Sequence, residues 1–205
     1  MEGHEYANES DRISRCPPFP KPRCYCKKCK KAREKGIPYE RICSSLFIYP
    51  NILIDTPEGV FRRLDRFKIK KLEHVFCTHW HPDHTQGHRI FEMWVRAGHL
   101  GGEQKPPIRV YFPTGMLQDF NEHLPSFSFY ETHKFIEIVQ VRDREELPFG
   151  NLTITPVSLQ REDRVRYSFL IKENNRKVMY APCSVFNAKF DQYWENLDIL
   201  FLETG

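Results

Sequence analysis

The order of apolar and polar residues predicts a hairpin, then strands that alternate with helices. Short apolar runs predict strands, and apolar residues at helical spacing predict helices. The expected strands are residues 45–49, 52–55, 72–77, 108–112, 135–141, 152–159, 165–171, 177–181 and, as a last buried strand, 199–202. The expected helices are residues 27–35, 60–67, 86–97, 113–123 and 191–196. This order is typical of a layered α/β domain.

Length and composition predict one globular domain over residues 1–205. A chain of 205 residues with 40% hydrophobic residues can bury a substantial core. No apolar run approaches the roughly 20 residues that a membrane helix needs, and the acidic, polar amino terminus is unlike a secretory signal. We therefore expect a cytoplasmic protein with no membrane partner.

The net charge of +4 is mild, but the basic residues are clustered. Residues 21–41 contain nine basic residues against Glu34 and Glu40, and residues 62–71 contain six against Asp65. Such clusters attract phosphate-bearing substrates or nucleic acid, although a solvated, charge-rich surface also explains them.

The run T-H-W-H-P-D-H, residues 78–84, directly follows the expected strand 72–77. Alternate residues of an extended segment point the same way, so His79, His81 and Asp83 are expected on one side. His84 follows at once and can turn toward a second point. Three imidazoles and a carboxylate suit zinc, manganese or iron.

The extended run T-H-W-H-P-D-H-T-Q-G resembles the H-x-H-x-D-H motif of the metallo-β-lactamase superfamily. That family has an αββα sandwich fold with a metal centre at its edge. The resemblance implies that His79 and His81 hold one metal ion, and that Asp83 and His84 hold a second. One or two zinc or manganese ions are therefore expected at this centre.

The resemblance covers about residues 45–91. Asp55, which ends I-L-I-D-T, is similar to the family aspartate that braces the metal loop. Within the loop, Pro82 stiffens the backbone, and Gly87 is expected to allow a tight turn into the next helix.

Three of the seven cysteines, Cys24, Cys26 and Cys29, have C-x-C-x-x-C spacing. In a cytosolic protein this spacing favours a metal over disulfides, and three reduced, inert thiols are the alternative. The run C-Y-C-K-K-C-K-K-A-R is similar to the amino-terminal insertion of phosphoribosyl 1,2-cyclic phosphate phosphodiesterases. That resemblance implies a structural zinc ion in an insertion at about residues 16–43. A fourth ligand is expected locally, from Cys16 or Cys43.

The chain departs from the family pattern at several positions. Gln160-Arg161-Glu162 stands where the family has a further histidine, although Glu162 could ligate. Cys183, in Y-A-P-C-S, stands where a metal-bridging aspartate is expected, and a thiolate is the softer ligand. The chain stops before the family's last histidine, so we expect an incomplete sandwich with an exposed sheet edge. Such an edge favours truncation, a homodimer or a covering partner.

The resemblance to the phosphodiesterases implies hydrolysis of a small, cyclic phosphodiester by a metal-bound hydroxide. Asp83 and His84 would be catalytic, and Arg161 with other basic residues would steady the phosphate. The alternatives are a non-catalytic, single-metal binding protein and an RNA-processing nuclease.

Overall fold

A computed structural model describes residues 19–100, 105–160, 165–183, 185 and 190–202. The chain divides into two compact units, with the boundary between Arg41 and Ile42. This boundary lies close to the end of the cysteine-rich insertion that the sequence predicts. No helix among the described residues is long and apolar enough to cross a membrane.

The first unit is built around helix α1 (Lys27–Lys35), which has the predicted bounds. Two pieces of backbone flank it and meet at an isolated bridge between Phe19 and Arg41. Between residues 19 and 41 only Cys29 and Ala32 are buried. The described part of this unit therefore has almost no apolar core of its own.

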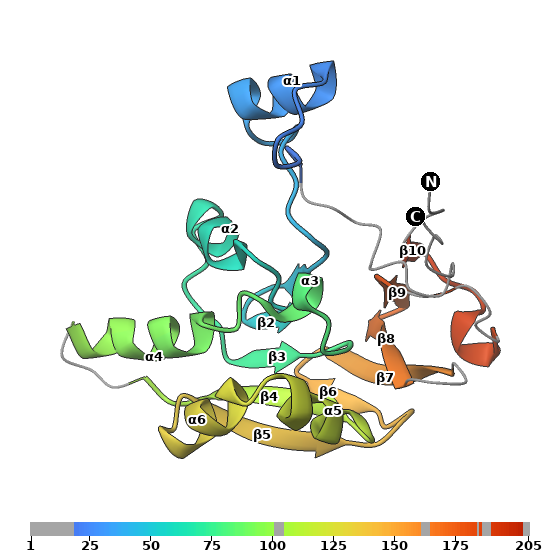
Figure 1. The fold of residues 1–205 in the computed structure, drawn as a ribbon. Helices are drawn as coiled ribbons and strands as arrows, with labels where there is room; N and C mark the ends of the chain where they lie inside the picture. The colour runs from blue at the N-terminus through green and yellow to red at the C-terminus, as the bar shows by residue number, and fades with distance from the viewer. Residues whose placement is uncertain (1–18, 101–104, 161–164, 184, 186–189, 203–205) are drawn as a thin grey trace, which may run out of the picture. The chain divides into compact units, whose positions relative to one another are not determined.

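The second unit contains a first sheet in which strands follow one another in chain order (Figure 1). Its strands are β1 (Leu46–Ile48), β2 (Ile52–Ile54), β3 (His74–Phe76), β4 (Ile108–Pro113) and β5 (Ile136–Val141). The pair β1–β2 is the predicted antiparallel hairpin, and the later pairs are parallel. Helices provide the crossovers between the parallel strands: α2 (Val60–Arg66), α3 (Pro82–Thr85), α4 (Ile90–Leu100), α5 (Met116–His123) and α6 (Ser126–Thr132).

A second sheet has the order β10-β9-β8-β7-β6. Its strands are β6 (Leu147–Phe149), β7 (Leu152–Gln160), β8 (Val165–Glu173), β9 (Arg176–Ala181) and β10 (Ile199–Leu202). All pairs are antiparallel except β10–β9, which is parallel. The predicted hairpin of residues 165–181 is confirmed.

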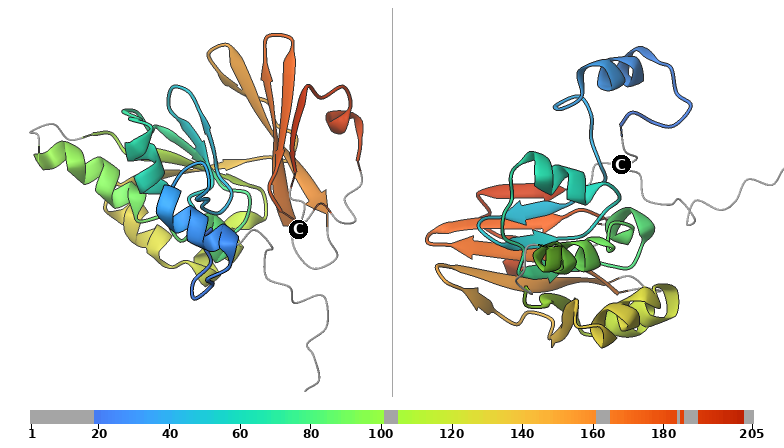
Figure 2. Two further views of the ribbon diagram at one scale, coloured as in Figure 1. Left: turned by 90° about the horizontal axis from the view of Figure 1, so that it is seen from above. Right: turned by 90° about the vertical axis from the view of Figure 1, so that its left-hand side faces the viewer.

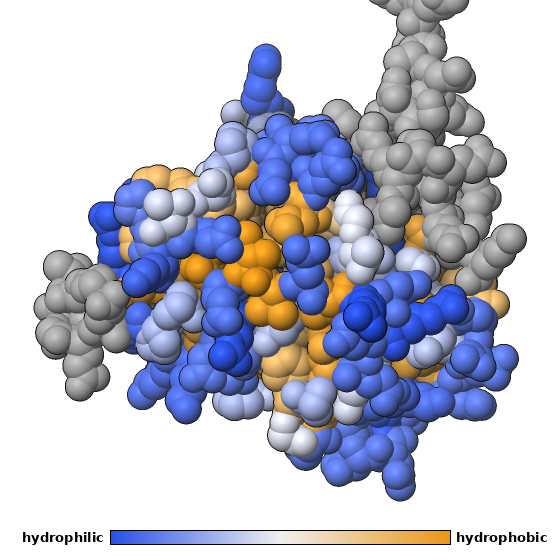
Figure 3. Space-filling model, turned by 90° about the horizontal axis from the view of Figure 1, so that it is seen from below, coloured by the Kyte–Doolittle hydropathy of each residue, from blue (hydrophilic) through white to orange (hydrophobic). Residues whose placement is uncertain are grey.

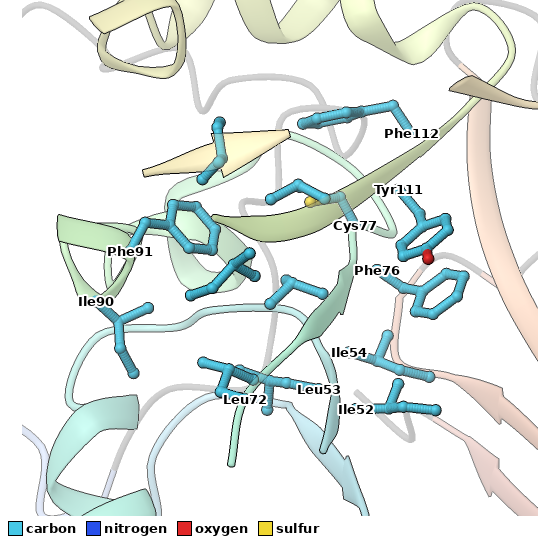
Figure 4. Packing of buried hydrophobic residues seen from close by; sticks show 14 of the residues in the cluster. Ile52, Leu53, Ile54, Leu72, Phe76, Cys77, Ile90, Phe91, Tyr111 and Phe112 are labelled. Carbon is cyan, nitrogen blue, oxygen red and sulfur yellow. The ribbon is translucent and has the colours of Figure 1, made fainter. Parts of the chain in front are cut away.

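The first sheet lies between a helical layer and the second sheet (Figure 2). On the side of the second sheet, Phe76 stacks on Tyr111 with ring centroids 4.4 Å apart and lies 5.4 Å from Phe169 of β8. Ile90 and Phe91 of α4 lie on the opposite side, beside the helices (Figure 4). The two-sheet α/β architecture that the resemblance implies is therefore confirmed.

A smaller apolar cluster lies on the second sheet, at Val157, Leu170, Met179 and Ala181. Tyr193 and Trp194 pack against it from a short 3-10 helix, η2 (Gln192–Trp194). The sequence predicts a helix over residues 191–196, and the structure shortens it to one turn. Asp191 caps that turn by accepting a hydrogen bond from the Tyr193 backbone N–H.

The sequence predicts that residues 199–202 form a buried strand, and this is wrong. All four side chains of β10 are exposed, from 48% at Ile199 to 39% at Leu202. The strand lies at the sheet edge with β9 as its neighbour on one side, so fewer residues can cover it. An apolar run shows that a strand forms, whereas burial depends on what packs beside it.

Other differences are local. Helix α4 begins at Ile90 rather than at residue 86, because the short helix α3 and a turn precede it. Strand β6 and helix α6 were not predicted. On the face seen from below, polar side chains surround a band of apolar side chains that crosses the middle (Figure 3).

Candidate metal centre

Two parallel strands bring the chemistry of the second unit together. Ile54 at the end of β2 pairs with Phe76 at the end of β3, so the loops that follow leave the same sheet edge. One loop begins with Asp55 and the other carries Thr78 and the histidine motif. Sequence-distant groups thereby become neighbours.

Asp55 braces the motif loop, as the resemblance implies. Its carboxylate accepts hydrogen bonds from the backbone N–H of Thr78 and from the Thr78 hydroxyl, both at 2.8 Å. It also accepts one from Nδ1 of His84 at 2.7 Å. Asp55 is 1% exposed and has a φ of 61°, a left-handed conformation that aspartate tolerates better than most residues. Three buried hydrogen bonds hold this strained residue in place.

The hydrogen bonds of His79 fix its tautomer. The Thr78 hydroxyl donates its hydrogen to Asp55, so its oxygen, 3.1 Å from Nδ1 of His79, acts as the acceptor there. Nε2 of His79 is then the unprotonated nitrogen, and it is buried without a hydrogen-bond partner among the described residues. Burial, followed by the charges of His84, His81 and Arg166, holds the pKa of His79 well below its usual range. A neutral imidazole with a bare nitrogen is a metal ligand.

His84 is oriented in the same way. Its Nδ1 donates to Asp55, which directs Nε2 toward Oδ2 of Asp83 at 3.3 Å. Burial lowers the pKa of His84. The charge and hydrogen bond of Asp55, with contributions from Asp83 and Cys183, outweigh burial, so the pKa lies well above its usual range. A divalent cation held by His84 would take the place of this proton.

Cys183 completes the group from the other sheet. It follows β9, and its ligand atom and those of His79 and His84 all lie within 4.8 Å of one another, with all three residues buried. The backbone N–H of Tyr167 donates to the Thr78 carbonyl at 3.1 Å and so joins β8 to the motif loop. A tetrahedral zinc ion with bonds of about 2.0 to 2.3 Å would hold its ligand atoms roughly 3.3 to 3.8 Å apart, which is compatible with separations of up to 4.8 Å in this group. The residues fit a metal ion, and we call this group the buried centre.

His81 and Asp83 lie beside the buried centre but outside the group within 4.8 Å. The ring of His81 is 4.6 Å from that of His79, and the side chain of Asp83 is 17% exposed. The expectation of an extended segment through Asp83 is wrong, because Pro82–Thr85 forms the helical turn α3. This turn folds His84 back toward His79, with ring centroids 4.2 Å apart.

Gly87 is needed for close approach of two backbones. Its N–H donates to the Thr56 carbonyl at 2.7 Å. A Cβ at this position would lie 2.3 Å from the Pro57 carbonyl oxygen and 2.9 Å from that of Thr56. The sequence predicts a glycine that allows a tight turn, and the structure gives the crowding as the reason.

A buried arginine reaches the buried centre. Arg166 of β8 is 9% exposed, and its Nη1 donates a hydrogen bond to Sγ of Cys183 at 3.3 Å. No motif spacing marks this residue in the sequence. Arg161 and Glu162, which the sequence suggests at the site, lie outside the described residues.

The first unit holds a second candidate site, the cysteine cluster of Cys24, Cys26 and Cys29. Their sulfur atoms lie within 4.8 Å of one another, as a metal site requires. Interactions with the Cys29 backbone and then with the Cys24 and Cys29 thiols lower the pKa of Cys26 to about 7. Desolvation raises the pKa of Cys29.

The loop of the cysteine cluster is held by helix α1. The Arg33 guanidinium donates to the carbonyl oxygens of Cys24 at 2.6 Å and Lys21 at 2.9 Å. Of the two expected fourth ligands, Cys16 lies outside the described residues and Cys43 belongs to the other unit.

A family model described as the β-lactamase superfamily domain matches residues 50–205. The chain belongs to the metallo-β-lactamase superfamily. Members of this superfamily are mostly metal-dependent hydrolases, and their metal is usually zinc.

The solved structures that share the fold of this protein include the following two. A diphosphatase of the PhnP family matches over 92% of this chain and 69% of its own, at 20% identity and a TM-score of 0.65. The metallo-β-lactamase fold protein YhfI from Bacillus subtilis matches over 78% of this chain, at 18% identity and a TM-score of 0.60. The match spans 63% of the length of YhfI. A sequence search of the curated proteins finds no match.

Proposed function

We propose that this protein is a metal-dependent hydrolase of a small phosphodiester, such as a cyclic phosphate. The observation that carries the proposal is the buried, unpartnered Nε2 of His79, which faces a group completed by His84 and Cys183. A buried polar atom without a partner costs about 1 to 3 kcal/mol. A cation bound by this nitrogen removes that cost, so the arrangement is matched to a metal ion.

A divalent ion held by these residues supplies Lewis acidity toward water and toward a phosphoryl oxygen. The chain supplies the remaining chemistry. Thr78 and Asp55 fix the histidine tautomers, so the ligand nitrogens stay aimed at one point. Asp83 is partly exposed beside His84 and is placed to orient a water molecule and accept its proton.

Two features support a phosphate substrate. The similar PhnP-family structure is a diphosphatase, and diphosphates and phosphodiesters both develop negative charge on phosphoryl oxygens during cleavage. In addition, a guanidinium lies inside the centre at Arg166. Guanidinium groups match the planar, paired oxygens of a phosphate.

The test measures bound metal and turnover of bis(p-nitrophenyl) phosphate, with a cyclic phosphodiester and a diphosphate as further substrates. We expect His79→Ala to lose one zinc or manganese ion per chain and to reduce turnover by about 100-fold or more. The matched control is His133→Ala, because His133 is exposed at the end of α6. Equal metal content and equal turnover in His79→Ala and the unaltered protein would refute the proposal.

A second candidate is cleavage of RNA by the same centre. The observation that favours it is the run of exposed basic residues on α1, at Lys27, Lys28, Lys30 and Lys31. Exposed cations at this density bind a phosphate backbone in a salt-dependent manner. Faster cleavage of a single-stranded RNA than of the small phosphodiesters would favour this candidate. Bound metal without turnover of any of these substrates would indicate a binding protein.

A further inference from the structure

Arg166 places a permanent positive charge inside the buried centre. Arginine stays protonated in proteins, and this guanidinium is 9% exposed while it donates to Cys183 at 3.3 Å. A buried charge needs compensation nearby. Cys183 is a member of the metal group, so the arginine contacts a ligand directly rather than bracing it from a distance.

Among the described residues, the charges around the buried centre balance with a single divalent ion. The carboxylates of Asp55 and Asp83 and a ligating Cys183 thiolate carry three negative charges, and the histidines ligate as neutral groups. The Arg166 guanidinium offsets one of these charges. One divalent cation offsets the remaining two, whereas a second would leave an uncompensated excess of positive charge in a buried site.

The guanidinium of Arg166 opposes any further positive charge at the Cys183 sulfur that it contacts. Removing this charge would lower the electrostatic cost of binding another cation.

We propose that Arg166 takes the electrostatic place of a second metal ion, so that the buried centre binds one divalent cation. The guanidinium then supplies the second positive charge that a phosphate substrate meets. The inference rests on the proposed function only for the identity of the substrate, because the ion count is a property of the protein alone.

Native mass spectrometry of the full chain in micromolar zinc tests the ion count. We expect Arg166→Met to bind one more zinc ion per chain than the unaltered protein, and Arg166→Lys, which keeps the charge, to bind the same number. Arg176→Met is the matched control, because Arg176 is exposed on β9. All four proteins share the cysteine cluster, so its contribution cancels in each difference.

A structural role alone would lower metal binding in Arg166→Met, whereas the proposal predicts a gain. If Arg166→Met does not fold, Arg166→Gln removes the charge while keeping a donor for Cys183 and is measured in the same way. Equal zinc content in the charge-removing variant and the unaltered protein overturns the inference. A double variant, His79→Ala with His84→Ala, is expected to lose one ion. Loss of two ions also overturns the inference, and loss of none overturns the proposed function.

Discussion

The cysteine cluster and the buried centre are two candidate metal sites built in opposite ways. The cluster takes its ligands from one short segment, in a unit where only Cys29 and Ala32 are buried between residues 19 and 41. The buried centre takes its ligands from both sheets, and the hydrogen bonds of Asp55 orient it. We therefore expect the cysteine cluster to depend on a bound metal for its fold, whereas hydrogen bonds within the fold already orient the side chains of the buried centre.

The largest expected effect comes from removing the metal. In hydrogen exchange with a chelator, α1 is expected to lose its protection completely, while β3 and β4 keep theirs. Structural zinc supplies about 10 to 16 kcal/mol in small zinc-binding peptides, far more than a unit with so few buried residues can replace. Unchanged protection of α1 without metal would identify the cluster as three inert thiols and remove the contrast.

The next effect concerns the residue that prepares the buried centre. Asp55→Asn removes the charge opposite His84, and we expect a loss of about 3 kcal/mol in the free energy of unfolding. Zinc affinity is expected to fall by about 10- to 100-fold. Urea unfolding and zinc competition measure the two effects.

Asp143→Asn is the matched control for Asp55→Asn. Asp143 likewise accepts hydrogen bonds from a backbone N–H and a hydroxyl, both from Ser158 at 2.8 Å. Asp143 is not among the groups that shift the pKa of His79 or of His84, so its loss is expected to leave zinc affinity unchanged. A similar fall in affinity in both variants would show that Asp55 acts through general stability.

Gly87→Ala is expected to destabilise the second unit by about 2 kcal/mol, because the added Cβ would overlap the Pro57 carbonyl oxygen. Thermal unfolding with and without zinc provides the measurement. Gly150→Ala is the control: its Cβ meets nothing within 4 Å, and only the φ of 63° opposes the change. If Gly87→Ala is as stable as the unaltered protein, the loop that contains Pro57 can shift to accommodate the added Cβ, and the prediction is wrong.

The smallest effect is expected in the first unit, at Arg33→Met. This change removes two hydrogen bonds to carbonyl oxygens of an exposed loop, and we expect the zinc affinity of the cysteine cluster to fall by about fivefold, or about 1 kcal/mol. Competition with a thiol-sensitive chelator measures it. Lys30→Met, on the same helix, is expected to have no effect. An equal loss in both would point to helix charge rather than to the hydrogen bonds.

Local features were predictable from the sequence. The hairpin of β1 and β2, the bounds of α1 and the group of Cys24, Cys26 and Cys29 all depend on neighbouring residues, and periodicity and spacing record such neighbours. The two sheets followed from the family resemblance. The role of Asp55 followed from it too, because the residue directly ends a strand beside the motif.

The remaining features depend on contacts that spacing does not record. The helical turn at Pro82–Thr85 was not predicted, because the alternating ligand residues of the motif suggested an extended loop. Arg166 reaches Cys183 across two paired strands, and a lone arginine in an apolar strand carries no signal of that contact. The exposure of β10 depends on what lies beside it. Each miss is a case in which tertiary packing determines the outcome.

The backbone hydrogen bond from Tyr167 to Thr78 has a consequence for the order of assembly. During synthesis, Asp55 and the motif loop leave the ribosome well before β8 and Cys183 do. The nascent chain then offers His79 and His84 to this centre but neither Cys183 nor Arg166, and long-range pairings form late in folding. Ion capture at this position therefore waits for the carboxyl-terminal strands, and cation loading marks a polypeptide in which both sheets have come together.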